Sequence, residues 1–285
     1  QNMHIAVVGC THGELDAVYD SVAKIEQTHG IKVELVLCCG DFQAMRGIHD
    51  LRSMACPDKY KSLCSFHHYH SGAKRAPVPT IFIGGNHEAS EHLFQIRYGG
   101  WAAPDMYYLG YAGCVRFGGL RIAGISGIYK SHDYAKGRYE CPPLSDSDMR
   151  SIYHQRSIDT FRLAQLSGTI DIMMSHDWPV NVTDYGDAAR LVREKPHFRD
   201  DMSKGELGSP AGAHLLQTLK PSYYFAGHMH CRFAAVVPHD LERKHATRFL
   251  ALSKPVPGEH FLQVRAHAHA HAHAHARAHA RAHGD

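Results

Sequence analysis

The chain has 285 residues, of which 44% are apolar, and a formal net charge of +3. These values are typical of a globular protein with one large α/β domain or two small ones. From Ala266 onward the sequence alternates alanine with histidine, which is typical of an affinity tail or a low-complexity end. Without Arg265, Arg277, Arg281 and Asp285 the chain has 28 basic and 27 acidic residues. The remaining net charge of about +1 does not argue for nucleic-acid binding, so any such argument must rest on local patches.

The eight cysteines include no C-x2-C pair, and several lie inside apolar runs. This pattern favours reduced thiols in an intracellular protein over a disulfide framework or a zinc ribbon. No run approaches the roughly 18 apolar residues of a membrane span, and the N-terminus has no signal-peptide pattern. We therefore expect a protein of the cytosol or nucleus.

The first predicted strand, residues 3–8, is followed by Gly9, Cys10, Thr11, His12 and Gly13. Residues 14–27 have apolar side chains at helical spacing, and this predicted helix closes at Gly30. A second strand, residues 33–39, ends in Gly40 and Asp41. Residues 44–76 are polar and rich in histidine, which favours a surface segment with short helices over a second metal site.

The third predicted strand, residues 78–83, ends in a segment that contains Asn86 and His87. Strand, helix and strand at this spacing indicate right-handed crossovers and a largely parallel sheet, in which ligands gather beyond the carboxyl ends of the strands. Residues 99–127 resemble several short strands that carry the chain into a second sheet. Residues 129–143 lack regularity, and a loop of this length is uncommon unless it is functional.

A helix is predicted from Ser147, its cap, to about Leu166. The fourth strand, residues 170–174, is followed by His176, and a polar connection over residues 180–208 leads to a helix near residues 211–219. The fifth strand, residues 223–226, is followed by His228 and His230. Further strands are predicted over residues 232–237, 247–252 and 260–264.

Five strand ends therefore present metal-ligand side chains. A single histidine after a strand is more often a satisfied core residue, but five strand ends with this pattern are not expected by chance. Imidazole, carboxylate, amide oxygen and thiolate together suit a pair of first-row divalent ions such as Zn, Fe or Mn. The candidates are Cys10, His12, Asp41, Asn86, His87, His176, His228 and His230.

These motifs resemble the pattern D-x-H, G-D, G-N-H-[DE], a lone His and G-H-x-H of the calcineurin-like metallophosphoesterases, over about the first 265 residues. The resemblance implies an α/β fold, a four-layer α-β-β-α sandwich with two mixed β-sheets, with residues 1–265 as the catalytic domain. It implies that one metal is held by Cys10, His12, Asp41 and His230. The bridging ligand Asp41 would hold the other metal together with Asn86, His176 and His228.

The same resemblance implies that His87 faces the phosphoryl group without being a ligand. Two metal ions would neutralise the developing charge on the phosphoryl oxygens and activate a water for in-line attack on phosphorus. His87, whose side-chain pKa is normally near 6.5, would protonate the departing alkoxide as a general acid. This acid should matter more for an alkyl diester than for an aryl phosphate.

Cys10 stands where the family has an aspartate. It does not fit a cysteine-phosphatase nucleophile, because the C-x5-R loop would need arginine at position 16, which is Asp16. Cys39 fails in the same way, since Met45 occupies the corresponding place. Two interpretations stay open: Cys10 is a soft ligand that favours Zn or Fe over Mg, or a bystander that leaves its site weak. The expected cofactors are Fe²⁺ and/or Zn²⁺, with Mn²⁺ as a substitute.

Within this family, several stretches resemble the RNA lariat debranching enzymes. That branch hydrolyses the 2′,5′-phosphodiester at the branch point of excised introns, releases the 2′-oxygen of the branch adenosine, and has a lariat-recognition loop, here about residues 124–156. The resemblance implies branched RNA as partner and a nuclear location, with shuttling to the cytoplasm left open. No membrane association and a monomer without an obligate protein partner are expected. The stretches are residues 9–16, 38–43, 84–90, 98–101, 126–134 and 175–179.

The loop also carries the side chains that bind unstacked RNA, namely aromatic faces and cations. On residue types alone a solvated basic loop is the better interpretation, but its place in a metal-site domain and the resemblance favour substrate binding. Acids at positions 133, 140, 146 and 148 argue against a simple phosphate-binding strip. The substrate-binding candidates are Tyr129, Lys130, His132, Tyr134, Lys136, Arg138 and Tyr139.

Members of this branch carry a further C-terminal domain, whereas the match here stops where the alanine-histidine tail begins, which fits either a catalytic core or a shortened form. Two other functions remain open. One is a metallophosphoesterase of other specificity, a protein phosphatase or small-molecule diesterase, and the other is a non-catalytic scaffold on the same fold.

Overall fold

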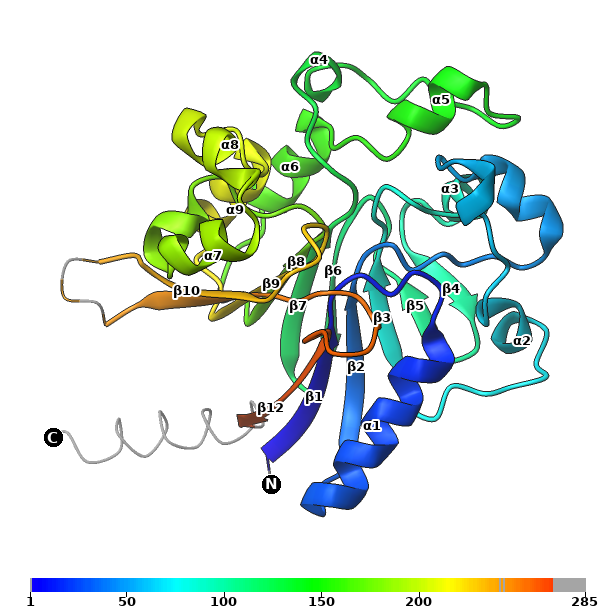
Figure 1. Ribbon diagram of the computed structural model, residues 1–285, viewed down its shortest axis with the longest axis horizontal. Helices are drawn as coiled ribbons and strands as arrows, with labels where there is room; N and C mark the ends of the chain where they lie inside the picture. The colour runs from blue at the N-terminus through cyan, green and yellow to red at the C-terminus, as the bar shows by residue number, and fades with distance from the viewer. Residues whose placement is uncertain (1, 241, 243, 269–285) are drawn as a thin grey trace, which may run out of the picture.

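The computed structural model describes residues 2–240, 242 and 244–268, and most of the alanine-histidine tail lies outside this part. Its strands form two six-stranded sheets that pack face to face (Figure 1). The first sheet has the order β12 (Leu262–Ala268), β1 (Asn2–Val8), β2 (Val33–Cys39), β3 (Thr80–Ile83), β5 (Met106–Tyr108), β4 (Gly100–Ala103). The second has the order β10 (Phe233–Pro238), β11 (Ala246–Ala251), β9 (Tyr223–Ala226), β8 (Ile172–Ser175), β7 (Leu120–Ile125), β6 (Ala112–Phe117).

Both sheets are mixed in the same way. In the first, β1, β2, β3 and β5 run parallel, and the edge strands β12 and β4 are antiparallel to their neighbours. In the second, β7, β8, β9 and β11 run parallel between the antiparallel strands β6 and β10. The carboxyl ends of parallel strands meet at one edge of a sheet, so the segments after β1, β2, β3, β8 and β9 can converge.

Helices cover the outer faces of the sheets, which completes the predicted four-layer arrangement (Figure 1). None of the helices in the described part is long and apolar enough to cross a membrane. The helices are α1 (Leu15–His29), α2 (Phe66–His70), α3 (Ser90–Gln95), α4 (Ser131–Tyr134), α5 (Asp146–Ser151), α6 (Ser157–Ala164), α7 (Ala188–Glu194), α8 (Phe198–Lys204) and α9 (Pro210–Leu219). Short 3-10 turns are η1 (Ile48–Ser53), η2 (Asp58–Tyr60) and η3 (Val182–Tyr185).

The central core lies between the sheets, where alternate strand residues such as Ile5, Leu37 and Ile172 are fully buried. On one outer face α1 buries Leu15 and Val18 against the first sheet, and on the other α9 packs against the second. Each fully buried Leu, Ile or Val contributes about 1.5–3 kcal/mol of transfer free energy. These cores hold both sheets rigidly below the strand ends.

The predicted helix over residues 147–166 is wrong. A capping box formed by Ser145 and Asp148 starts α5, which ends at Ser151, and a separate α6 starts at Ser157. Between them His154 forms a β-bridge with Ile128, and Arg156 is buried in an ion pair with Glu140. These long-range contacts remove the segment from the helix, although its local sequence permits one.

Two further boundaries differ from the prediction. The connection over residues 180–208 contains η3, α7 and α8 and is not merely a polar loop. Strand β12 pairs with β1 as far as Ala268, opposite Asn2, so the first three residues of the predicted tail belong to the fold. The backbone of β1 supplies this edge, and pairing there needs no particular side chains. Residues 269–285 lie outside the described residues.

Candidate metal centre

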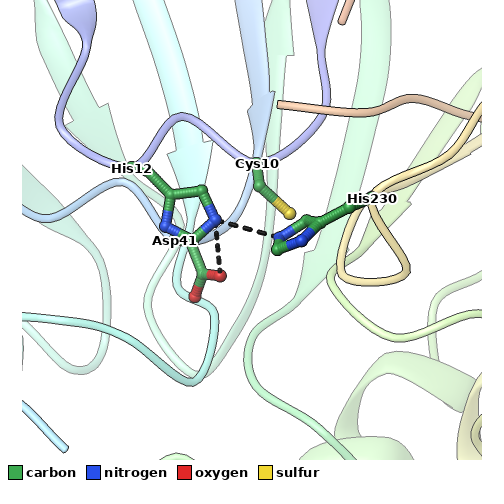
Figure 2. Close-up of side chains that lie close together, drawn as sticks. All are labelled: Cys10, His12, Asp41 and His230. Atoms are coloured by element: carbon green, nitrogen blue, oxygen red, sulfur yellow. Dashed lines mark hydrogen bonds and ion pairs between the residues drawn. The ribbon is translucent and has the colours of Figure 1, made fainter. Parts of the chain in front are cut away.

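The loops that follow β1, β2 and β9 bring four metal-ligand side chains together (Figure 2). The ligand atoms of Cys10, His12, Asp41 and His230 all lie within 4.8 Å of one another. The Nε2 atoms of His12 and His230 are 3.0 Å apart, and His12 Nε2 is 3.6 Å from Asp41 Oδ2. The first set of ligands predicted from the sequence is therefore assembled in the structure.

The second predicted set lies on the other side of Asp41. His176 Nε2 is 3.5 Å from Asp41 Oδ1 and 3.1 Å from Asn86 Oδ1. The rings of His176 and His228 have centroids 4.9 Å apart. One carboxylate oxygen of Asp41 thus faces each group, which is the geometry of a bridging ligand.

The backbone at the strand ends is shaped to gather these side chains. His12, Asp41, His228 and His230 all have positive φ angles between 46° and 64°. Such conformations are uncommon for residues with a side chain and concentrate at functional sites. A Cβ on Gly85 would lie only 2.2 Å from Asp41 Oδ1, so glycine is needed for this close approach.

Hydrogen bonds orient the imidazoles for ligation. His176 Nδ1 lies 2.8 Å from the carbonyl oxygen of Cys39, so Nδ1 carries the proton and Nε2 presents its lone pair to the centre. The Gln43 side-chain amide lies 3.3 Å from His12 Nδ1. The atom of Gln43 at this distance is the amide nitrogen Nε2, and the tautomer of His12 sets which of the two nitrogens donates.

The electrostatics also favour cation binding. Burial lowers the pKa of His176 to about 4, and burial together with His12 lowers that of His230 to about 3. Both imidazoles are therefore neutral near pH 7, which is the form that binds metals. Burial alone would raise the pKa of Asp41, but His176, His12 and His87 outweigh it and lower the value to about 2. Asp41 is therefore an anion at neutral pH.

Cys10 is fully buried, and its Sγ accepts a hydrogen bond of 2.9 Å from the backbone N–H of His228. Burial and the nearby Asp41 raise the pKa of the thiol well above its usual range. A thiolate at this place therefore needs a cation to stabilise it. Sulfur, nitrogen and oxygen donors converging here fit a first-row divalent ion.

His87 is half-buried beside the two groups of ligands. Its backbone N–H donates to Asp41 Oδ1 at 2.8 Å, and its Nδ1 lies 3.2 Å from the carbonyl oxygen of Ala55. If Nδ1–H donates to this carbonyl, Nε2 is the nitrogen left to exchange a proton with a substrate. The ring centroid lies 6.1 Å from that of His12.

Sequence reasoning assigned no role to three residues that support this centre. Glu88 is buried and accepts from the backbone N–H groups of Phe42, Gln43 and Gly85, which ties the loops after β2 and β3 together. Burial and Asp41 raise its pKa to about 8. Its place in the G-N-H-E motif was the only sequence signal.

The other two are Asp177 and Lys254. Asp177 follows the candidate ligand His176 and accepts from the backbone N–H of Tyr129 at 3.1 Å, which connects the loop after β7 to the centre. Lys254 follows β11, which runs parallel to β9. After burial, its charge is among the causes that lower the pKa of His12 and His230. A lysine after a strand matches no metal-ligand pattern, so no sequence signal singles it out.

Some side chains of the candidate substrate loop are exposed to solvent, and others form ion pairs within the protein. Lys130 and Tyr139 are exposed, and Tyr139 retains 84% of its accessible surface. The Tyr129 and Tyr134 rings lie 5.2 Å apart. Arg138, in contrast, donates to Asp159 at 2.6 Å and lies over the Tyr111 ring at 3.5 Å. Its charge is satisfied within the protein, so the structure does not leave it free for a phosphate.

The remaining loop candidates surround Asp133. Lys136 Nζ lies 2.9 Å from Asp133 Oδ1, and His132 Nε2 lies 3.4 Å from Oδ2. His154 Nδ1 also approaches Oδ2, at 2.7 Å. The ligand-type atoms of His132, Asp133 and His154 lie within 4.8 Å of one another, like those of the first set. Asp133 already has a cation beside it, so this cluster is a poor metal site.

The model of the calcineurin-like phosphoesterase family matches residues 3–232 of the chain. The lariat debranching enzyme of Gallus gallus is 52% identical over 266 residues, covering 92% of this chain and 50% of the relative. The lariat debranching enzyme of Drosophila melanogaster is 55% identical over 242 residues, covering 85% and 45%. That of Arabidopsis thaliana is 52% identical over 262 residues, covering 92% and 62%. The chain spans about half the length of most of these relatives.

Proposed function

The chain belongs to the calcineurin-like phosphoesterase family, and from this premise we propose that it is a metal-dependent phosphodiesterase that cuts the 2′,5′ bond at the branch point of lariat RNA. The observation that carries the proposal is Asp41, whose two carboxylate oxygens face two groups of ligands with His87 beside them. The relatives named as lariat debranching enzymes support the choice of substrate.

We assign Cys10, His12, Asp41 and His230 to one metal, and Asp41, Asn86, His176 and His228 to the other. The donor set favours Fe²⁺ or Zn²⁺, with Mn²⁺ as a substitute, because it contains a thiol and several imidazoles. When bound, such ions supply Lewis-acid stabilisation of phosphoryl oxygens and lower the pKa of water. The side chains would hold these ions in fixed positions, because Glu88 ties the loops after β2 and β3 together and the Cys39 carbonyl fixes the tautomer of His176.

His87 acts as the general acid in this proposal. An alkoxide such as the ribose 2′-oxygen is a poor leaving group, so it needs a proton as the phosphorus–oxygen bond breaks. Nδ1 faces the Ala55 carbonyl, which leaves Nε2 to deliver that proton to the leaving oxygen. The products would be a 2′-hydroxyl on the branch nucleotide and a 5′-phosphate on the released RNA end.

The loop at residues 124–156 would hold the RNA near this centre. Tyr129, Tyr134 and Tyr139 offer aromatic faces for unstacked bases, and Lys130 offers an exposed cation. Asp177 links the start of this loop to His176, so the substrate platform and the metal centre are positioned together. We narrow the phosphate-binding role to Lys130, since Lys136 and Arg138 are paired with acids.

We further propose that the protein acts as a monomer on branched RNA in the nucleus, without an obligate protein partner. These proposals rest on the resemblance of its motifs to the debranching branch. Imaging of a fluorescently tagged chain together with sedimentation of the purified protein tests them. A predominantly cytoplasmic signal or a stable dimer would contradict them.

The main experiment incubates the metal-reconstituted protein with a synthetic branched RNA and with a linear RNA of the same sequence. We expect cleavage only at the branch, with the 3′,5′ bonds intact. Indiscriminate cutting of both RNAs would contradict the proposal. Preference for a phosphoserine peptide or a cyclic nucleotide would select a protein phosphatase or small-molecule diesterase, and no turnover with any added metal would select the scaffold.

A further inference from the structure

A groove opens between the edge strand β12 of the first sheet and strands β9, β10 and β11 of the second, with a cavity volume of about 330 Å³. Three arginines on separate elements line it, namely Arg232, Arg248 and Arg265, and no acidic side chain is among its lining residues. We call this feature the arginine groove. It lies outside the ligand set of the metal centre.

The charges of the arginine groove are not satisfied within the described part of the protein. None of the three guanidinium groups has an ion-pair or side-chain hydrogen-bond partner there, whereas Arg46, Arg138 and Arg156 each contact a carboxylate. Instead, Arg265 and Arg248 lie 4.8 Å and 5.8 Å from the centre of the Tyr223 ring. Stacking on an aromatic face orients a guanidinium and leaves its N–H donors available to an anion.

The surface beside these arginines is aromatic and apolar. Tyr185 is 45% exposed and Val236 is 58% exposed at the groove. Alternation along β10 places Ala234 and Val236 on its exposed face. Aromatic and apolar faces interleaved with arginines suit a flexible polyanion whose units also have flat faces, which describes single-stranded nucleic acid.

The groove leads away from the metal centre. Arg232 is two residues after the candidate ligand His230, so one end lies beside the site. Arg265 pairs with Ile5 of β1, and Ile5 lies five residues before Cys10. Five residues of extended chain span about 17 Å, so Arg265 lies about that far from the metal centre. A strand of RNA that leaves the centre past Arg232 would therefore meet Arg248 and Arg265 next.

We propose that the arginine groove binds the sugar-phosphate backbone of a single-stranded RNA arm that extends from the branch. This inference rests on the proposed function for the identity of the RNA, but binding to the groove can be measured without any cleavage. An acidic protein segment is the other occupant that the charges would accept, and the test includes it.

The test compares wild type with the double variant Arg248→Gln/Arg265→Gln, using a fluorescent single-stranded RNA of about 12 nucleotides. Anisotropy titrations over a range of salt concentrations give the affinity and its salt dependence. We expect the double variant to bind about tenfold more weakly and to lower the salt slope by about 1.4, or about 0.7 for each lost phosphate contact. Melting curves establish that the variants are folded.

Two controls make the result specific. The double variant Arg162→Gln/Arg199→Gln removes the same charge from exposed positions on α6 and α8 and should leave binding unchanged. The variant Arg248→Lys/Arg265→Lys keeps the charge and should retain most of the salt slope. Equal RNA binding by wild type and the Gln double variant would overturn the proposal. So would tighter binding of a glutamate-rich peptide of equal charge than of the RNA.

Cleavage separates this proposal from the proposed function. If both hold, branched RNA with long arms has a lower KM than branched RNA with short arms, and the Gln double variant abolishes this difference without changing hydrolysis of a small aryl diester. If wild type binds single-stranded RNA through the groove but cuts no branched RNA, the proposed function is wrong and the proposal that the groove binds RNA is upheld. If branches are cut and arm length has no effect on KM, the groove proposal fails alone.

Discussion

The metal centre and the cluster of His132, Asp133 and His154 contain similar side chains within the same 4.8 Å radius. Their charges are balanced in different ways. Asp133 has the ammonium of Lys136 at 2.9 Å and the His154 ring at 2.7 Å. Asp41 has no lysine or arginine partner among the described residues and is surrounded by imidazoles and a backbone N–H.

This comparison shows that closeness of ligand types is not enough to identify a metal site. The deciding question is whether the protein itself supplies a cation to the carboxylate. Where it does, the cluster is an internal ion-pair network, and binding a metal would require displacing Lys136. At Asp41 the protein supplies no such cation among the described residues. The buried carboxylate and the neutral imidazoles around it can therefore be stabilised by a divalent ion.

We expect the greatest loss of function from Asp41→Asn. The change removes the negative charge shared by both groups of ligands, so we expect loss of bound metal and a fall in branched-RNA cleavage on the order of 10³-fold or more. Elemental analysis of the reconstituted protein and a cleavage assay measure both. The matched variant Asp133→Asn should keep its metal content, and a loss of metal from that variant would contradict the conclusion that the cluster around Asp133 is a poor metal site.

His87→Ala should lower turnover by about 10²–10⁴-fold, the usual contribution of a general acid. Metal content should stay intact because His87 is not assigned as a ligand. An aryl diester, whose leaving group needs no proton, should lose much less activity than branched RNA. His132→Ala, in the other cluster, should leave aryl diester hydrolysis unchanged. Equal losses of His87→Ala on both substrates would argue against the proton-transfer role.

Cys10→Ser tests the role of the thiol, which the metal centre contains and the cluster around Asp133 lacks. If Cys10 is a ligand, the cobalt-substituted wild type shows a thiolate-to-metal charge-transfer band that the variant lacks. Metal affinity should fall by at least the roughly 10–100-fold that loss of a supporting side chain causes. Cys64→Ser, whose sulfur lies 3.6 Å from the carbonyl oxygen of His12, is the control and should retain the band. No band in wild type would make Cys10 a bystander.

The smallest effect is expected for the stability of Asp133→Asn. The Lys136 hydrogen bond, acting against burial and aided by His154, lowers the pKa of Asp133. A lowered carboxyl pKa gives stability that is present above the unfolded pKa near 3.8 and is lost as pH falls through the folded value. At pH 7 the variant should lose about 1–2 kcal/mol in the free energy of unfolding.

Chemical denaturation at several pH values measures this difference, which should narrow as the pH drops below about 3.8. Asp200→Asn, at an exposed position on α8, should show no comparable effect. A difference for Asp133→Asn that stays constant down to the lowest pH would contradict the ion-pair interpretation.

The sequence was sufficient to predict where the main strands lie and which side chains follow them. Buried runs such as residues 33–39 are continuous in sequence, and parallel strands place their carboxyl ends at one edge whatever the intervening loops do. The ligand types at those ends therefore predicted a common site, and the structure assembles both sets around Asp41. Strand β12 was predicted with too early an end because backbone pairing with β1 continues into a sequence without strand character.

Other features were decided only by tertiary contacts. The break between α5 and α6 depends on Arg156 meeting Glu140 and on the bridge from His154 to Ile128. Likewise, Arg138 forms an ion pair with Asp159, 21 residues away in the sequence. Its positive charge, which the loop sequence suggested for RNA binding, is therefore already neutralised. Ion pairs of this kind are set by distances in space, which local sequence patterns do not encode.

The amino-acid sequence is enough to tell which strands end in candidate ligands, because hydrophobic periodicity and the residue types that follow it are local properties. Which charges remain unpaired among the described residues follows from tertiary contacts, since the arginine groove is built from side chains on β11, on β12 and on the segment before β10. Whether a charge is available depends on every neighbour that packs against it, and those neighbours come from distant parts of the chain.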